Sequence, residues 1–163
     1  MIYLTVFEDL EKGVEYIKKA AFGEYPFAQN NYGLIWQLYF HNLGNAQYMY
    51  ERSSKHHFAL SEFNLGQLFE KEKEEKAIQY FIQASNDENE PLIFHNFSHY
   101  DFQLSISKKF IICLANLKLS LYYLNKKLNY EESKKYFVRS FSSLNDKSYQ
   151  FHFNRIHCNI SKL

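Results

Sequence analysis

The sequence predicts an all-α fold, a short solenoid in which helices pack as pairs. Two observations lead to this prediction: a pattern of small and large residues that returns at helical spacing, and a scarcity of turn formers. The 163 residues include only 5 Gly and 2 Pro, but 16 Phe and 14 Tyr. So few turn residues favour long helices over a β-sandwich, which needs many turns. We expect a single domain over residues 1–163.

Four segments repeat one pattern: a small residue, a large residue four positions later, and a small residue three positions after that. In a helix these positions lie on one face. Helices approach closely only where side chains are small, and the large residue fills the groove between them. The pattern therefore predicts four helices that each pack closely against a neighbour. Its positions are Gly13, Ile17 and Ala20; Ala46, Tyr50 and Ser53; Ala77, Phe81 and Ala84; and Ser133, Phe137 and Ser140.

A second pattern surrounds Gly33 and Gly66, which are 33 residues apart. Glycine inside a helix costs about 1 kcal/mol relative to alanine, so each of these residues needs a structural reason. Close contact with a neighbouring helix backbone is the usual reason, and a large aromatic residue follows each glycine after three positions. Ser120 takes the glycine's place in a third copy. The other matching residues are Pro26, Ala28, Asn30, Tyr32 and Trp36; Ala59, Ser61, Phe63, Leu65 and Phe69; and Cys113, Ala115, Leu117, Leu119 and Tyr123.

The run from Ser53 to Gly66 resembles the junction of Sel1-like repeats, in which an Ala-Ala pair leads through a short loop into the pattern A-x-A-x-Y-x-L-G. Residues Ala20 to Gly33 are similar to it with the same spacing, and the small–large–small helices also match the pattern of TPR repeats. The resemblance implies a right-handed superhelical solenoid of antiparallel helix pairs. It places repeat copies at about 25–54, 58–85 and 108–143.

The expected helices follow from this periodicity and from the polar stretches between the segments. Residues 86–107 interrupt the repeats and are interpreted as an insertion; the alternative is a degenerate helix at 92–102 that pairs with the next one. Residues 1–7 fit the stub of a first helix, and the last helix fits a cap at the C-terminal end. The helices are expected at about 9–22, 25–40, 45–54, 58–72, 75–85, 106–125, 130–143 and 148–161.

Composition argues against several functional classes. The 19 basic and 18 acidic residues give a formal net charge of +1, which provides no long-range attraction to nucleic acid or anionic lipid. The longest apolar stretch, Phe110–Leu124, is too short and too polar to span a bilayer. Met1–Leu10 lacks the basic start of a signal peptide. Only 2 Cys cannot form a disulfide framework, so the chain is expected in a reducing compartment, the cytoplasm. From the charge balance and the short apolar stretch, we expect it to bind neither nucleic acid nor membranes.

No residue pattern indicates catalysis, a cofactor or a metal. A zinc site needs three or four converging ligands with a recognisable spacing, and the histidines and cysteines show none. The sequence also lacks a phosphate-binding loop, an HExxH motif and a nucleophile elbow. We therefore expect no enzymatic activity, although a metal-dependent enzyme on a helical scaffold is one alternative. The residues considered are His56 and His57 in a loop, His95 and His99 on one helical face, His152, His157 and Cys158 near the C-terminus, and Cys113, interpreted as a buried apolar side chain.

The resemblance implies a function in protein binding. A stack of helix pairs curves and offers a concave face lined by the first helix of each pair, where TPR-like proteins hold peptides or partner helices. We therefore expect a scaffold or adaptor, and the alternative is a structural segment of a larger protein. The positions flanking the glycines mix apolar and amide side chains, which suit an amphipathic helix or an extended segment. They are Phe27, Asn30, Leu34, Gln37, Leu60, Phe63, Gln67, Glu70, Leu117 and Leu121.

Overall fold

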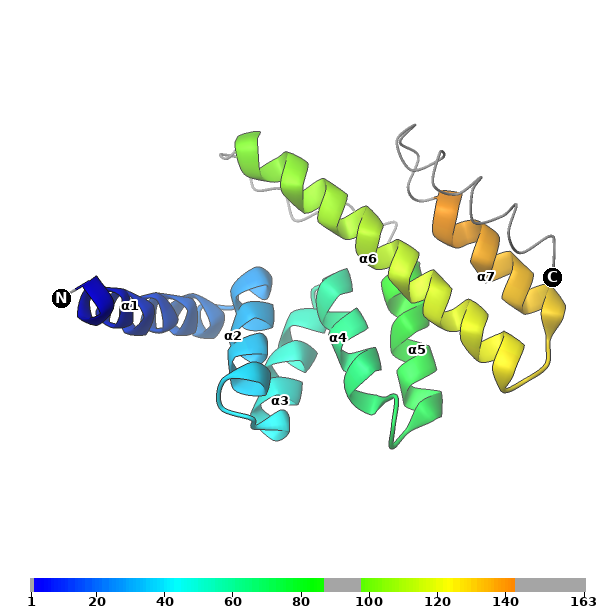
Figure 1. Cartoon of the computed structure of the whole chain (residues 1–163), viewed down its shortest axis with the longest axis horizontal. Helices are drawn as coiled ribbons and strands as arrows, with labels where there is room; N and C mark the ends of the chain where they lie inside the picture. The colour runs from blue at the N-terminus through cyan, green and yellow to red at the C-terminus, as the bar shows by residue number, and fades with distance from the viewer. Residues whose placement is uncertain (1, 87–97, 143–163) are drawn as a thin grey trace. The chain divides into compact units, whose positions relative to one another are not determined.

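A computed structural model describes the backbone of residues 2–86 and 98–142, and side chains within 11–86 and 109–142. Every regular element in these ranges is a helix, so the prediction of an all-α fold is confirmed. The chain forms two compact units, Met1–Ala84 (unit 1) and Ser85–Leu163 (unit 2). The helices are α1 (Ile2–Phe22), α2 (Pro26–Leu38), α3 (Leu43–Ser54), α4 (Ala59–Phe69), α5 (Glu74–Ser85), α6 (Ser98–Asn125) and α7 (Tyr130–Ser142) (Figure 1).

The helix boundaries depart from the expected ones chiefly in α1 and α6. α1 begins at Ile2 and runs without a break, so the start of the chain is not a separate stub. α6 begins at Ser98, and the last part of the expected insertion is therefore helical and continuous with the helix expected at 106–125. No glycine or proline interrupts α6, which explains its length. The rest of the expected insertion, 87–97, and the expected cap at 148–161 lie outside the described residues.

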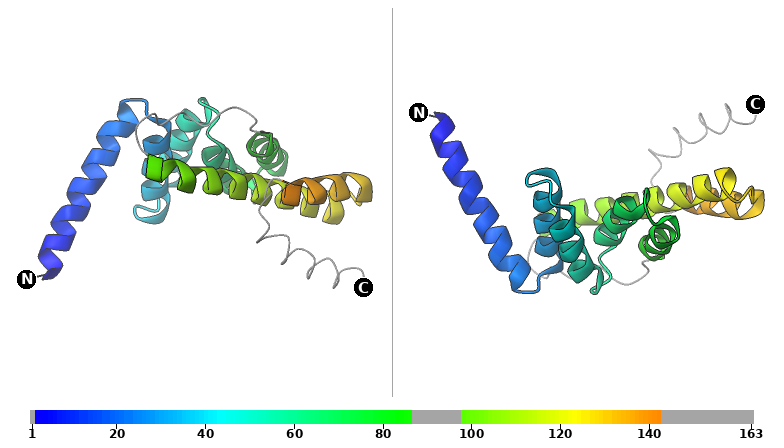
Figure 2. Two further views of the ribbon diagram at one scale, coloured as in Figure 1. Left: turned by 90° about the horizontal axis from the view of Figure 1, so that it is seen from above. Right: turned by 90° about the horizontal axis from the view of Figure 1, so that it is seen from below.

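In unit 1 each helix packs on the next one along the chain. The core begins between α1, α2 and α3, where Ala21, Ala28, Tyr32 and Met49 form one buried cluster. In unit 2, α6 and α7 lie side by side, as Figures 1 and 2 both show. None of the described helices is long and apolar enough to cross a membrane.

Gly33 and Gly66 lie where an aromatic ring of the following helix needs room. A Cβ atom built on Gly33 would lie 2.6 Å from Cε1 of Tyr50, and one built on Gly66 would lie 2.5 Å from Cε1 of Phe81. Tyr50 and Phe81 are the large residues of the small–large–small pattern. The glycines therefore do allow a close approach, but the neighbour is a side-chain ring and not a helix backbone.

A second contact recurs beside the first. The aromatic residue three positions after Gly66, or after Ser120, packs on the residue that precedes the large one. In the second and third copies both residues are aromatic and their rings are stacked, with centroids 5.8 Å and 5.5 Å apart and planes inclined by 9° and 7°. These two copies thus share one packing arrangement, in the pairs Phe69 with Tyr80 and Tyr123 with Tyr136. In the first copy, Trp36 packs against the buried cluster that includes Met49.

The α2–α3 and α6–α7 turns are also alike. Asn42 and Asn129 stand before the second helix, and each side-chain Oδ1 accepts a hydrogen bond from the backbone N–H three residues later, at 2.9 Å and 3.1 Å. This is the usual way to satisfy a free N–H group at a helix start. The residues before them, His41 and Leu128, have positive φ angles of 51° and 48°. The α2–α3 turn of unit 1 and the α6–α7 turn of unit 2 therefore have the same length and the same cap, and each has a positive φ angle at the same position.

Replacing Gly66 with alanine is expected to lower the free energy of unfolding by up to about 2 kcal/mol. Overpacking against Phe81 costs about 1–3 kcal/mol, and the gain in helix propensity offsets about 1 kcal/mol of that cost. Gly13→Ala is the matched control, because a Cβ on Gly13 would meet no atom within 4 Å. It is expected to raise the stability by up to about 1 kcal/mol. Urea unfolding followed by circular dichroism measures both, and equal effects would contradict the steric explanation.

Candidate functional site

The candidate site is the surface formed by α2 and α4, which a buried polar network holds together. Ser61 Oγ of α4 lies 2.6 Å from Ser53 Oγ of α3 and 3.1 Å from Asn30 Oδ1 of α2. Asn64 Nδ2 donates to Asn30 Oδ1 at 3.0 Å, and Ser53 Oγ donates to the carbonyl oxygen of Pro26 at 2.8 Å. Buried polar groups that lack partners are costly, so this network specifies how the three helices meet.

Two of the expected binding residues lie inside unit 1. Asn30 is 0% exposed and its Oδ1 atom is the shared acceptor of the network. Phe63 is 5% exposed, and its ring centroid lies 5.6 Å from that of Phe81. In this arrangement both side chains hold helices together and do not contribute to the surface. Helical periodicity could not separate them from surface residues, because the helices that pack beside α2 and α4 cover more than one face.

A third expected residue, Gln37, connects the surface with the core. The hydroxyl of Tyr50 donates to Gln37 Oε1 at 2.7 Å. Tyr50 is fully buried, and burial raises the pKa of its phenol well above the ordinary value for tyrosine. The phenol therefore keeps its proton and stays a donor at neutral pH. Gln37 is half-buried, with its amide oxygen oriented by this bond.

The expected residues of unit 1 other than Asn30 and Phe63 form two rows, Gln37 included, that match each other across the repeat. Within a row the positions are separated by seven and then three residues, which places them along one side of a helix. The bond between Asn30 and Asn64 shows that the two helices are neighbours. Gln67 and Glu70 are exposed and the other four residues are half-buried. These six residues are named the α2–α4 surface: Phe27, Leu34 and Gln37 on α2, Leu60 and Gln67 on α4, and Glu70 directly after α4.

The last two expected residues belong to unit 2. Leu117 is half-buried and Leu121 is exposed, both on α6. Beside them, Ser120 Oγ lies 3.1 Å from Ser133 Oγ of α7, so the serine that replaces the glycine makes a buried polar contact with the next helix. Leu121 is therefore a surface residue of unit 2, next to the α6–α7 packing.

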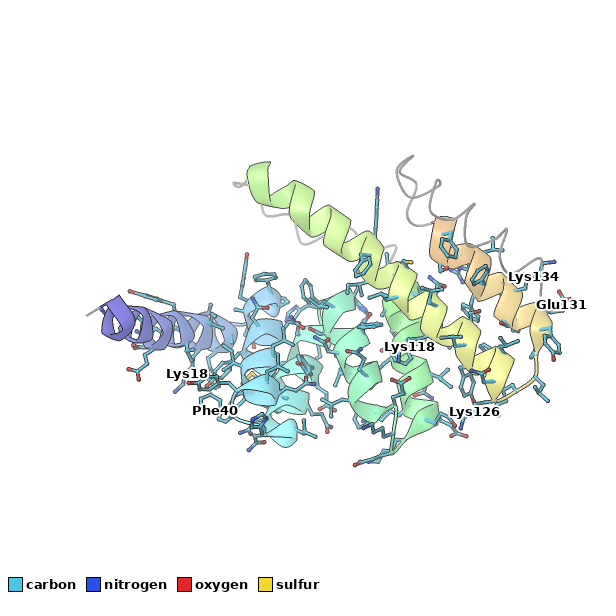
Figure 3. All side chains as sticks on the ribbon, in the orientation of Figure 1. Lys18, Phe40, Lys118, Lys126, Glu131 and Lys134 are labelled. Carbon is cyan, nitrogen blue, oxygen red and sulfur yellow. The ribbon has the colours of Figure 1, made fainter. Side chains whose placement is uncertain are left out.

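An exposed apolar patch at the α2–α3 turn was missed by the sequence reasoning. Leu38, Tyr39, Phe40 and Leu43 are all exposed, and Figure 3 labels Phe40 at this turn. The ring centroid of Phe40 lies 4.9 Å from that of Trp36. Contiguous exposed apolar side chains often mark an interaction site. A signal was present in the sequence, since Leu38, Tyr39 and Phe40 end the helix expected at 25–40 and Leu43 stands in the turn expected after it, where polar residues are usual.

The described residues show little of the chemistry that a metal or catalytic site would need. Among them, no three His, Cys, Asp or Glu residues gather in a way that could hold a metal ion. Cys113 is buried, as expected, and burial raises the pKa of its thiol. His56 and His57 are exposed in the α3–α4 turn. The other candidates fall outside the described side chains: His95, His99, His152, His157 and Cys158.

Comparisons with protein-family models, with curated proteins and with solved structures found no match to this chain. Membership of the Sel1/TPR repeat family therefore stays a prediction from the repeat pattern. The function of the α2–α4 surface is inferred from its own contacts and composition.

Proposed function

We propose that the chain is a right-handed superhelical solenoid of Sel1/TPR-type repeats that acts in the cytoplasm as a non-enzymatic scaffold for another protein. Recurring contacts support this proposal. The contact between a glycine and the ring of the next helix occurs in two copies. The stacked aromatic pair occurs in two copies, and so does the turn with a positive φ angle before the second helix. Stacked copies of a single helical unit are the basis of solenoid folds, whose extended faces bind partners.

The partner is proposed to be an amphipathic helix or an extended segment bound across the α2–α4 surface. The observation that carries this proposal is the pair of matching rows, held side by side by the buried Asn30 network. Phe27, Leu34 and Leu60 supply apolar area that a partner would remove from water. The amides of Gln37 and Gln67 lie among them and suit polar groups at the edge of such a partner. Glu70 is the one charged residue in the set, so charge contributes little to recognition.

Affinity purification with the full-length chain tests this function. The double variant Leu34→Ala/Gln67→Ala removes one side chain from each row. Leu34 is half-buried and Gln67 is exposed, and neither belongs to the buried network, so the fold is expected to persist. Lys71→Ala changes an exposed residue in the α4–α5 turn and is the control. A partner that wild type and the control retain should bind the double variant about tenfold more weakly or worse.

Mass spectrometry identifies the retained proteins, and binding of the purified partner gives the ratio of affinities. If the purified partner binds the double variant as tightly as the wild type, the α2–α4 surface is not its binding site. If no protein is retained specifically by the wild-type chain, the scaffold function itself is contradicted.

A further inference from the structure

In each copy the first helix covers one face of the second: α2 covers α3, α4 covers α5, and α6 covers α7. The covered face consists of the three positions of the small–large–small pattern and of the residue directly before the large one. Each of the twelve side chains is buried or half-buried, and the three residues at the last position are 0% exposed. The residues are Ala46, Met49, Tyr50 and Ser53 in α3; Ala77, Tyr80, Phe81 and Ala84 in α5; and Ser133, Tyr136, Phe137 and Ser140 in α7.

α1 carries the same four positions, but no helix of unit 1 covers them as fully. Tyr16 is 71% exposed, whereas Met49 at the same position of α3 is 3% exposed. Ala20 is also exposed, and a Cβ on Gly13 would meet no atom within 4 Å. Ile17 is half-buried because it packs toward α2. In both views of Figure 2, α1 stands clear of α3, α4 and α5.

The three covered copies show what kind of element fits this face. In each, the covering helix has glycine or serine followed three positions later by an aromatic residue. The glycine lies against the large residue in the first two copies, and Ser120 lies against Ser133 in the third. In the second and third copies the aromatic residue stacks on the position equivalent to Tyr16, which is Tyr80 or Tyr136. Stacked aromatic pairs contribute beyond the area that they bury. Among the described residues, no aromatic ring is stacked on Tyr16 as rings are stacked on Tyr80 and Tyr136.

The short hairpin that supplies this cover elsewhere is not available to α1. In the other copies, the glycine or serine of the first helix stands eleven or thirteen positions before the first small residue of the second helix. The turn between the two helices lies within that stretch. The eleven positions before Gly13 begin at Ile2, and α1 is helical from Ile2 onward, so they contain no such turn. A helix that covers this face is therefore not joined to α1 by this short turn.

We propose that α1 binds an α-helix of a partner polypeptide through Gly13, Tyr16, Ile17 and Ala20. The partner helix carries glycine or serine followed three positions later by an aromatic residue, and its ring packs on Tyr16. This face shares no residue with the α2–α4 surface, and binding to it does not depend on the function proposed for that surface.

A peptide with the sequence of residues 58–72 of this chain is the probe, because it contains Gly66 and Phe69 at the required spacing. It is acetylated, amidated and labelled with fluorescein, and its binding to the full-length chain is followed by fluorescence anisotropy. A helix of this length is only marginally stable alone, so we expect weak but saturable binding below about 1 mM.

Variants of α1 locate the binding site. Tyr16→Ala removes the stacking surface, and Gly13→Leu fills the open position that alanine or serine occupies in the covered copies. Each is expected to weaken binding by about tenfold or more. Gly13→Ala and Lys18→Ala should bind as the wild type does; Lys18 lies on α1 in Figure 3 and is exposed. A peptide with Phe69→Ala should also bind about tenfold more weakly.

Each outcome decides the proposal. All α1 variants are expected to fold, since Tyr16 is mostly exposed and glycine is a poor helix former, and circular dichroism checks this. The proposal is overturned if binding does not saturate, or if Tyr16→Ala and Gly13→Leu bind as well as Lys18→Ala. The variant Leu34→Ala/Gln67→Ala should bind the peptide normally, so that failure here and failure of the α2–α4 surface remain distinguishable.

Discussion

Phe81→Ala is expected to lower the free energy of unfolding by about 3–5 kcal/mol, the cost typical of removing a fully buried phenylalanine. Phe81 is 3% exposed, its ring fills the space above Gly66, and it packs against the ring of Phe63. Without the ring a cavity is left between α4 and α5, and glycine has no side chain that could relax into it. Urea unfolding of the full chain, followed by circular dichroism, gives the change.

Phe40→Ala is the matched control for this substitution, since it removes the same side chain from an exposed position in the same unit. Its expected cost is below about 1 kcal/mol, because exposed substitutions away from special features change stability little. Similar losses for Phe81→Ala and Phe40→Ala would mean that the α4–α5 contact does not stabilise unit 1. The same result would remove the support that this contact gives to the repeat arrangement.

Asn30→Ala is expected to lower the free energy of unfolding by about 2–3 kcal/mol, although the sequence placed Asn30 on a binding face. The substitution removes the oxygen that accepts from Asn64 Nδ2 and lies near Ser61 Oγ. Both groups are buried, so at least one donor loses its partner away from water. Urea unfolding followed by circular dichroism measures the loss, which should appear without any binding partner present.

A double-substitution cycle separates this effect from simple loss of packing. Asn30→Ala and Asn64→Ala remove the two ends of one hydrogen bond, so the double variant should cost less than the sum of the single ones. Gln67→Ala deletes an exposed amide on α4 and should stay within about 0.5 kcal/mol of the wild type. If Asn30→Ala is as stable as Gln67→Ala, Asn30 does not hold α2 and α4 together.

The helices could be predicted because their signals are local. Small and large residues at helical spacing located α2 to α5 and α7, and their ends fall within a few residues of the expected ones. The ends of α1 and α6 were predicted less well, because nothing in those segments opposes a longer helix: α6 contains no glycine or proline. Local propensity sets where a helix can continue, and only its neighbours decide where it stops.

The ten expected binding residues could be placed on helices from the sequence, but their exposure could not. Asn30 and Gln37 are both polar residues of α2, yet one is buried in a network across three helices and the other lies at the surface. That difference depends on Ser61 and Asn64, more than thirty residues away in the chain. A pattern along one helix carries no information about such distant partners.

The sequence by itself determined the fold class, the helical positions, and the residues that had to be small. Steric requirements of this kind act between fixed positions of a repeat, so they leave a periodic trace in the sequence. Only the tertiary structure decided which ring fills the space at each glycine, which polar residues are buried, and that Tyr16 lacks the cover its counterparts have. These features arise from contacts between separate helices, and no single segment of the chain records them.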